Sequence, residues 1–422
     1  MSNIAIIGAG LSGLALALAL HQQSIPCTIY EARSAPLNIG GAIMLSPNAL
    51  RILDHLGVYT RLLPDAYLFD HLHFRTTTDT PLDTYEFGNT TKYNYPGMRI
   101  YRHVLIRELS ALIHEAGIPI HYNKKFHHIL TESPTTVIWE FTDGTTASAT
   151  CLVGADGIHS TVRKYLYPDL EPQFTNIVGV TATIPTSQLN LPSIYPLPVT
   201  ILNPTHGAFI IAPQLPSGTE LLIGRQKHSP HLTRKEWSSL LENKEWCVDF
   251  LREDSTSYPD LVQRAVSSIN SDTINLWPFY IVPRLESWTS GLGNVVVLGD
   301  AAHAIPPSAG QGVNQAFEDG FTFALVLERC ITTTTATDVG GGIPGGSGDR
   351  LKRGLKVWQK GRQERVDRVL DLNKRVDRRR MPKQSGGGGD GVDGEEEPFE
   401  LEWLYKPDFG EMVEGWLAGE GL

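Results

Sequence analysis

The sequence predicts an α/β fold in which a doubly wound nucleotide-binding domain receives a sheet-rich insertion. Three observations predict it. An apolar run, a glycine-rich turn and a helix-forming run follow one another at the N-terminus, over residues 4–20. Two further strand-turn-helix segments begin near residues 151 and 295. Between them, over 172–275, short β-like runs alternate with proline- and glycine-bearing turns.

The first turn carries the pattern of a dinucleotide site. Residues 4–7 are apolar and suit a buried parallel strand, and Gly8, Gly10 and Gly13 follow before the helix-forming run 14–20. Gly8 permits the tight turn, Gly10 lets the backbone approach a pyrophosphate, and Gly13 lets the helix pack on the strand. The free N–H groups of the helix N-terminus also favour a phosphate.

Glu31 stands where the acid of a dinucleotide site is expected. It follows the predicted strand 27–30 and lies eighteen residues beyond Gly13, close to the ~20-residue spacing of the carboxylate that binds a ribose hydroxyl pair. The same carboxylate would repel a 2′-phosphate. The sequence therefore favours FAD or NAD over NADP at this first site.

Asp156 and Asp300 follow the other two predicted strands. Asp156 is either a helix cap or a group beside the pyrophosphate, and taken alone it favours the cap. Asp300 lies ten residues before a glycine pair, Gly310 and Gly312, that opens a helix. That helix N-terminus could stabilise negative charge on a reduced flavin ring, and Asp300 would accept hydrogen bonds from ribityl hydroxyls. Three such turns could contact a single long ligand along its whole length, which indicates FAD. His303 is expected to have a structural role in its turn.

Composition and charge exclude several classes of protein. The 422 residues suffice for two domains and a large core, and the net charge of −10 argues against a general nucleic-acid binder. The four cysteines have no metal-type spacing. We therefore expect no metal site, and a reducing, cytoplasmic compartment.

The uncharged stretch 4–20 admits a second interpretation, a signal peptide or membrane anchor. No basic residue precedes it, three glycines interrupt it, and no small-residue cleavage pattern closes it. Its seventeen residues also fall short of the ~20 that span a bilayer. We therefore expect neither a targeting segment nor a membrane span.

The predicted domains are discontinuous along the chain. The predicted FAD-binding domain comprises 1–70, 98–171 and 276–380, the substrate domain comprises 71–97 and 172–275, and the linker and docking segment comprises 381–422. Within the last part, 385–397 is glycine- and acid-rich and is expected to be disordered. The glycine-rich stretch 339–348 is expected to form a flexible surface loop.

A basic helix is predicted over about 350–378. Its lysines and arginines are interspersed with acids, so we expect a solvated face. Contact with nucleic acid, or a nuclear-import signal around Arg378, Arg379 and Arg380, is the alternative for this helix.

The chain resembles the single-component FAD-dependent aromatic hydroxylases, the class A flavoprotein monooxygenases, in the branch that includes salicylate hydroxylase. The resemblance runs from residue 2 to about 380 and rests on the three glycine-rich motifs, the last continued by Pro306 and by Gly310-Gln311-Gly312 with Asn314. The C-terminal pattern Trp403-Leu404-Tyr405 is most similar to fungal members.

The resemblance implies a Rossmann-like FAD-binding domain with an inserted sheet-rich substrate domain of the aromatic hydroxylase type. It implies noncovalent FAD, NADPH or NADH as reductant, and O2 as co-substrate. It also implies insertion of one oxygen atom, through a flavin hydroperoxide, into an aromatic, phenolic or polyketide-type small molecule, with a role in secondary metabolism.

The resemblance further implies roles for individual residues. Glu31 matches the adenosine-ribose ligand, Ala42 lies where the family backbone approaches the flavin, and Arg102 matches an arginine near the pyrophosphate. Contacts in the flavin region are implied for Asp300, Pro306, Gly312 and Val313. No catalytic side chain is assigned.

One departure concerns the substrate. Some polyketide-hydroxylating relatives hold a phenolate with an arginine and a tyrosine of the inserted domain, and this chain has Thr181 and Ala212 at the matching places. A neutral or differently anchored substrate therefore stays open, with Arg225 as an alternative anchor. The candidate apolar lining consists of Pro306, Phe209, Ile211 and Trp277.

Other activities remain open on the same fold. An FAD-dependent epoxidase and an NAD(P)H oxidase or reductase would share these motifs. A flavin halogenase is disfavoured because the sequence has no Trp-x-Trp segment. A non-enzymatic nucleotide-binding protein is disfavoured because it would need the three FAD segments for no chemistry.

Overall fold

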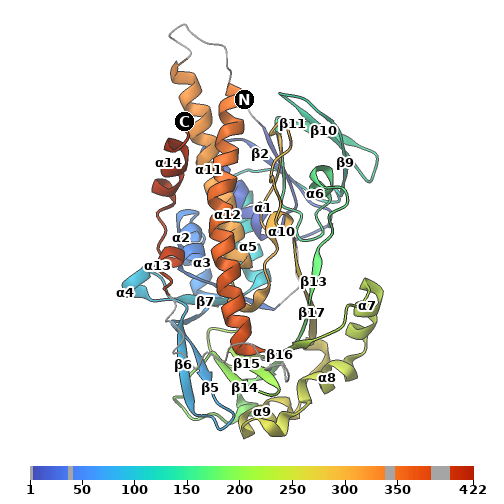
Figure 1. Ribbon diagram of the computed structural model, residues 1–422, viewed down its shortest axis with the longest axis vertical. Coiled ribbons are helices and arrows are strands. Elements are labelled where there is room, and N and C mark those ends of the chain that lie inside the picture. Colours follow the sequence, from blue (N-terminus) through green and yellow to red (C-terminus); the bar gives the residue numbers. More distant parts are fainter. Residues whose placement is uncertain (1–2, 37–40, 338–346, 382–399) are drawn as a thin grey trace, which may run out of the picture.

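The computed structural model describes residues 3–36, 41–337, 347–381 and 400–422 (Figure 1). The predicted disorder over 385–397 and most of the predicted loop over 339–348 lie outside these residues. Residues 347 and 348 already belong to a helix, α12 (Ser347–Arg380). Among the described residues, no helix combines the length and apolarity needed to cross a membrane.

A five-stranded parallel sheet forms the centre of the upper part of the molecule (Figure 1). Its strands, in spatial order, are β18 (Val295–Val297), β12 (Cys151–Gly154), β1 (Ile4–Ile7), β2 (Cys27–Tyr30) and β8 (Ile120–His121). The strands β1, β12 and β18 are buried along their whole length, as expected for a parallel sheet covered on both faces. This order brings all three predicted glycine-rich turns to the carboxyl ends of neighbouring strands.

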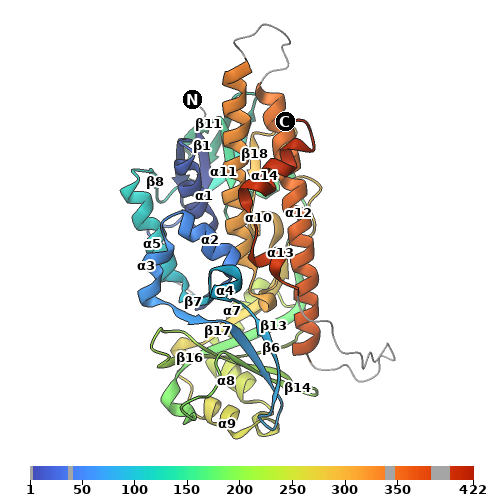
Figure 2. The same ribbon diagram turned by 90° about the vertical axis from the view of Figure 1, so that its left-hand side faces the viewer.

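Helices cover this sheet. The helices around it are α1 (Leu11–Gln22), α2 (Pro47–His55), α5 (Arg102–Glu115), α6 (Thr161–Leu166), α10 (Asp300–His303) and α11 (Gly312–Thr337). The contact of α1 with α11 is close, because a Cβ added at Gly320 would lie 3.2 Å from the side chain of Leu16. Outside α11, α12 runs lengthwise down the molecule and reaches the lower sheet (Figures 1 and 2).

The C-terminal segment lies against α11 and α12 (Figure 2). It contains α13 (Glu402–Tyr405) and α14 (Phe409–Ala418). Tyr405 is fully buried, and its ring lies 5.3 Å from that of Tyr93 in α4 (Thr90–Tyr93). This aromatic contact attaches the end of the chain to the body of the protein.

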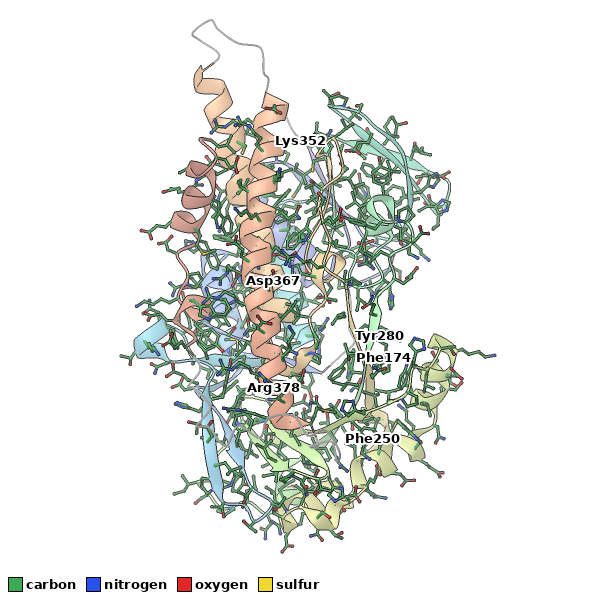
Figure 3. All side chains as sticks on the ribbon, in the orientation of Figure 1. Phe174, Phe250, Tyr280, Lys352, Asp367 and Arg378 are labelled. Atoms are coloured by element: carbon green, nitrogen blue, oxygen red, sulfur yellow. The ribbon has the colours of Figure 1, made fainter. Side chains whose placement is uncertain are left out.

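A seven-stranded sheet forms the lower part of the molecule. Its strands, in spatial order, are β17 (Asn275–Ile281), β13 (Gln173–Pro185), β16 (Glu220–His228), β15 (Gly207–Pro213), β14 (Val199–Asn203), β5 (His71–Arg75) and β6 (Pro81–Glu86). Only the pair β14–β5 is parallel. Three helices cover one face, with Phe250 among the residues packed there (Figure 3): α7 (Arg234–Glu242), α8 (Lys244–Arg252) and α9 (Asp260–Ser267).

Two smaller sheets complete the fold. The first joins β3 (Ala42–Leu45), β7 (Gly97–Tyr101) and β4 (Tyr67–Phe69). It connects the seven-stranded sheet with the helices of the upper part. Arg99 of β7 donates to the carbonyl oxygen of Pro213 in β15, and Ser46, just after β3, donates to Asn314 of α11. The second joins β9 (Phe126–Glu132), β10 (Val137–Phe141) and β11 (Thr146–Ala149), and it packs against the inner strands β1 and β2 of the parallel sheet.

Candidate functional site

In the glycine-rich turn between β1 and α1, two glycines permit close backbone packing, and a third has open space beside it. Gly8 has φ +109°, and a Cβ there would lie 2.6 Å from the carbonyl oxygen of Ala155. A Cβ at Gly13 would lie 2.0 Å from the carbonyl oxygen of Gly8. A Cβ at Gly10 would have no described atom within 4 Å, and no side chain caps α1. Gly10 therefore leaves the N–H groups of the α1 N-terminus accessible to an anion.

Glu31 is bound to the same turn. Its Oε2 accepts a hydrogen bond of 2.8 Å from the backbone N–H of Ala9, and its Oε1 accepts one of 2.8 Å from the backbone N–H of Arg33. The residue is only 4% exposed. Oε1 also accepts a 3.2 Å hydrogen bond from Arg33 Nη1. These bonds fix the carboxylate beside the glycine-rich turn and leave Oε2 further acceptor capacity for a hydroxyl donor.

Asp156 is a helix cap in this structure. Its Oδ2 accepts hydrogen bonds from the backbone N–H groups of Thr161, at 2.7 Å, and Val162, at 3.1 Å, at the start of α6. Burial raises the pKa of Asp156. The neighbouring Ala155 contacts Gly8, so the cap lies beside the first glycine-rich turn. The cap and the predicted place near a pyrophosphate are therefore compatible.

Arg102 and Asp300 carry opposite charges, and both lack hydrogen-bond partners for their side chains among the described residues. Arg102 begins α5 and Asp300 begins α10. Burial lowers the pKa of Arg102 and raises the pKa of Asp300, and the charge of each residue partly opposes the shift of the other. Neither side chain hydrogen-bonds to the described part of the chain. Asp300 is nevertheless reached by solvent. Both charged groups are therefore available to a polar ligand that would supply the missing partners.

The start of α11 is tied to β3, which carries Ala42. Asn314 Oδ1 accepts a 3.1 Å hydrogen bond from the backbone N–H of Ser46, and Asn314 Nδ2 donates a 2.6 Å hydrogen bond to the carbonyl oxygen of Gly310. Gly312 and Val313, the first residues of α11, remain half-buried. The first N–H groups of a helix have no intrahelical partner. This places another anion-favouring helix end on the side of β3.

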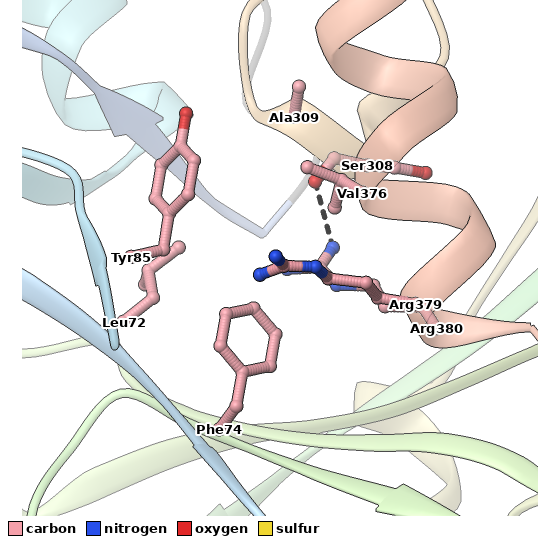
Figure 4. Close-up of a pocket in the computed structure, with 8 residues that line it drawn as sticks. All are labelled: Leu72, Phe74, Tyr85, Ser308, Ala309, Val376, Arg379 and Arg380. Atoms are coloured by element: carbon pink, nitrogen blue, oxygen red, sulfur yellow. Dashed lines mark hydrogen bonds between the residues drawn. The ribbon is translucent and has the colours of Figure 1, made fainter. Parts of the chain in front are cut away.

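Pro306 lies just before this helix start. It precedes a short helical turn, Pro307–Ala309, that leads to Gly310. A Cβ at Gly310 would lie 3.5 Å from the ring of Phe87 and 3.6 Å from Met44. The turn is held from the other side by α12, because Arg380 Nη1 donates a 2.8 Å hydrogen bond to the carbonyl oxygen of Ser308 (Figure 4).

A buried ionic network behind Asp300 was not predicted from the sequence. Asp319 of α11 accepts hydrogen bonds from the backbone N–H of Gly299, at 2.8 Å, and from Arg362 Nε, at 2.8 Å. His303 Nε2 lies 2.6 Å from Asp319 Oδ2, and the His303 ring packs on Trp288. His303 thus has the structural place that was expected for it.

The prediction of a solvated basic helix was wrong for part of α12. Arg362 is fully buried, and it pairs with Glu318 and with Asp319. Arg365 Nε lies 2.6 Å from Glu318 Oε2. Arg380 is also buried. Two consecutive acids in the apolar helix α11 were the only sequence signal for buried cationic partners. Among charged residues on other sides of α12, Lys352 and Arg378 remain exposed and Asp367 is half-buried (Figure 3).

The predicted lining by Phe209 and Ile211 was wrong. Both are fully buried in the cluster between the seven-stranded sheet and the helices α7–α9. Because side chains alternate along a strand, their neighbour Ile210 points to the opposite face. That face also carries Thr181, Thr183, Ala212 and Leu222. Leu222 approaches Gly41, since a Cβ at Gly41 would lie 3.9 Å from it.

Trp277 belongs to the edge strand β17. It is 47% exposed. It pairs in register with Gly179, on the face opposite to that of Phe209. Trp277 therefore lies on the open side of the sheet but at its rim.

Arg225 does not reach the open face. It is 2% exposed, and it points among the helices α7–α9. Its guanidinium donates to the carbonyl oxygens of Glu253 and His206, and it lies over the ring of Tyr258. The alternative substrate anchor proposed from the sequence is therefore wrong, because the same alternation that buries Phe209 buries Arg225.

Three groups of metal-ligand type, two of them exposed, meet on the sheet formed by β9, β10 and β11. A β-bulge sets His127 and His128 opposite Glu140, and their ligand atoms all lie within 4.8 Å of one another. Strict alternation would have placed consecutive histidines on opposite faces. The bulge is the reason that sequence spacing did not reveal this cluster.

Comparisons with known proteins agree with this geometry. Residues 1–338 match the protein family described as FAD binding domain. A 3-amino-4-hydroxybenzoate 2-monooxygenase, PtnB3 of Streptomyces platensis, is 30% identical over 77% of this chain and 79% of the relative. The hispidin-3-hydroxylase of Neonothopanus nambi is 29% identical over 79% of this chain and 82% of its own.

Solved structures share the fold over nearly the whole chain. A substrate complex of salicylate hydroxylase superposes with a TM-score of 0.74 at 20% identity and covers 98% of both chains. CtdE in complex with FAD and a substrate superposes with a TM-score of 0.76 at 20% identity, over 99% of this chain and 98% of the other. The predicted fold, cofactor and enzyme class are therefore confirmed, and the chain belongs to the FAD-binding-domain family of flavoprotein monooxygenases.

Proposed function

We propose that this enzyme hydroxylates a small aromatic, phenolic or polyketide-type compound, with O2 as co-substrate and NADPH or NADH as reductant. The couple formed by Arg102 and Asp300 carries the proposal. Two opposite charges without hydrogen-bond partners among the described residues, beside two accessible helix N-termini, fit a long ligand with a pyrophosphate and hydroxyl groups.

The residues of the site would divide the cofactor among them. The α1 N-terminus at Gly10 and the Arg102 guanidinium would hold the pyrophosphate, and Glu31 would accept from the ribose hydroxyls. Asp300 would accept from the ribityl hydroxyls, and the N–H groups of Gly312 and Val313 would favour negative charge at the ring. When bound, FAD supplies the two-electron chemistry that activates oxygen.

The open face of the seven-stranded sheet fits an aromatic substrate. It presents apolar side chains, Ile210 and Leu222, among hydroxyl groups of Thr181 and Thr183. The smaller sheet closes over one end of this face, where Gln214 Nε2 donates to both Tyr101 Oη and Thr183 Oγ1 at 2.9 Å. Such a contact between sheets would limit the entry of bulk water at that end of the face.

The relatives support this substrate class. Two relatives are named for the aromatic compounds 3-amino-4-hydroxybenzoate and hispidin. The superposed salicylate hydroxylase is named for a third aromatic compound. We infer that this enzyme takes a compound of the same class.

Oxygen incorporation tests the proposal. Purified, FAD-loaded protein is mixed with NADPH or NADH and a panel of phenolic and polyketide-like compounds, under 18O2. We expect one compound to accelerate reductant oxidation and to gain one labelled oxygen as a hydroxyl group. Rapid, substrate-independent oxidation to peroxide would instead identify an oxidase, and a labelled epoxide would identify an epoxidase.

A further inference from the structure

Arg99 is a buried arginine on the inner face of the small sheet. It lies on β7, paired in register with Met44 of β3 and Tyr67 of β4. Its neighbours Met98 and Ile100 are fully buried in the core of the upper part. Because side chains alternate along a strand, Arg99 points away from that core, toward the seven-stranded sheet.

The guanidinium of Arg99 is poorly satisfied. Its Nε donates a 2.7 Å hydrogen bond to the carbonyl oxygen of Pro213, while its Nη2 is buried without a partner. The residue is 5% exposed, and among the described residues no carboxylate forms an ion pair with it. Burial lowers the pKa of Arg99 to about 10, so the group remains charged at neutral pH.

Two other buried arginines of this chain have more partners. Arg362 has two carboxylate partners. Arg225 donates to two backbone carbonyls and lies over an aromatic ring, although its Nε has no partner. A buried charge without a counter-ion costs several kcal/mol, as an approximate general figure. When a protein retains such a charge at an interface between domains, we expect the charge to bind an anion that comes from a ligand.

Arg99 stands at the open face proposed for the substrate. Its acceptor Pro213 directly follows Ala212, which lies on that face. Two residues along β7, Tyr101 is linked through Gln214 to Thr183 of the same face. The inserted domain has Thr181 and Ala212 at the places where some relatives hold a phenolate with an arginine and a tyrosine. Arg99 of the facing small sheet can supply the missing cation.

We propose that Arg99 is an anion subsite that binds an acidic group, a carboxylate or phenolate, of the aromatic substrate. This inference rests on the proposed function and narrows it to acidic aromatic compounds. The uncommitted N–H groups of a guanidinium suit the two oxygens of a carboxylate.

The first test separates a binding arginine from a structural one. Thermal unfolding of the FAD-loaded protein is compared for wild type, Arg99→Met and the matched variant Arg225→Met, all without substrate. Arg99→Met gives up one hydrogen bond, to Pro213, but it also removes a buried charge without a counter-ion, so it should unfold at the wild-type temperature or above. Arg225→Met also removes such a charge, but it gives up hydrogen bonds to two carbonyls and the contact with the Tyr258 ring, so it should unfold below the wild-type temperature. Equal destabilisation by both substitutions would show that Arg99 is structural and would overturn the proposal.

The second test measures charge selectivity directly. Salicylate and its neutral analogue salicylamide are titrated by calorimetry into FAD-loaded wild type and Arg99→Met. We expect the wild type to bind salicylate more than about tenfold tighter than salicylamide, and Arg99→Met to lose that preference. No preference in the wild type, or the same preference in Arg99→Met, would overturn the proposal.

The use of FAD-loaded protein excludes the cofactor's own phosphates as the anion. The outcome is also independent of turnover. If the enzyme proved to be an oxidase, with no labelled oxygen in any product, an Arg99-dependent preference for salicylate would still establish the anion subsite. Conversely, hydroxylation without that preference would leave the proposed function standing and remove the subsite.

Discussion

The backbone N–H of Gly299 donates a 2.8 Å hydrogen bond to the carboxylate of Asp319. This bond joins the turn that carries Asp300 to the long helix α11. Arg362 of α12 donates to the other oxygen of Asp319 at 2.8 Å. The helix α12 therefore supports the proposed cofactor turn from behind.

Removal of Arg362 should destabilise the protein and weaken FAD retention. Arg362→Met leaves Glu318 and Asp319 buried without this partner, and breaking a buried ion pair costs about 3–5 kcal/mol. Urea denaturation measures the loss, and the flavin absorbance after gel filtration measures retention. Lys374→Met, which removes an exposed ion pair with Asp371, is the matched control and should be nearly neutral. Equal effects of the two substitutions would contradict the supporting role of Arg362.

The same variant should have a distinct pH dependence. In the wild type, burial opposes ionisation of Glu318 and Asp319, yet the neighbouring cations outweigh it and hold the pKa of each acid below its ordinary value. Stability from depressed pKa values is lost as the pH falls below the unfolded-state values of about 4. In Arg362→Met, protonation should instead relieve an unpaired buried charge. The difference in unfolding free energy between the two proteins should therefore narrow from about pH 7 to about pH 4, and a constant difference would contradict the ionic assignment.

Two glycines of the first turn should respond in opposite ways to the same substitution. Gly13→Ala places a Cβ 2.0 Å from the carbonyl oxygen of Gly8 and should cost about 3 kcal/mol of folding free energy. Gly10→Ala meets no described atom within 4 Å, so it should cost under about 1 kcal/mol. Gly10→Ala should nevertheless weaken FAD binding, because its methyl group enters the space proposed for the pyrophosphate. Normal FAD affinity in a well-folded Gly10→Ala protein would contradict that placement.

Loss of the Asp300 carboxylate should weaken FAD binding without unfolding the apoprotein. Asp300→Ala removes the proposed acceptor of the ribityl hydroxyls, and a hydrogen bond to a charged group contributes about 1.5–3 kcal/mol, or roughly 10- to 100-fold in affinity. Since burial raises the pKa of this unpaired acid, the apoprotein should not lose stability. Fluorescence titration of apoprotein with FAD measures the affinity, and wild-type affinity would refute the assignment.

The nucleotide turn could be predicted because its signals are local. Gly8, Gly10, Gly13 and Glu31 belong to one strand-helix-strand unit, in which each spacing is set by the geometry of two adjacent strands. Fold class followed from the same local patterns, together with the change of pattern over 172–275.

The contacts that shape the rest of the site are not local. Arg362 and Asp319 are 43 residues apart in the sequence, and Arg99 and Pro213 are 114 apart. No periodicity relates such pairs, because their meeting depends on how the helices and sheets pack. A basic helix has the same composition whether its arginines face water or a buried acid, so the sequence could not distinguish the two.

The face of strand β15 predicted to line the substrate space was the wrong one, and this error has a different cause. Ile210 and Ile211 are chemically identical, so alternation defines two faces without saying which one is covered by helices. The structure buries Ile211 under α7–α9 and leaves Ile210 half-buried on the open face.

Alanine substitution should therefore separate these two isoleucines. Ile211→Ala should cost about 2–5 kcal/mol, as expected for a buried isoleucine, and should leave KM for the aromatic substrate nearly unchanged. Ile210→Ala should cost less than about 2 kcal/mol and raise KM, because it removes apolar surface from the proposed substrate space. Urea denaturation and steady-state kinetics on the two variants measure both quantities. If Ile211→Ala changed KM and Ile210→Ala did not, the substrate would lie on the helix-covered side, and the placement of the active site between the two sheets would be wrong.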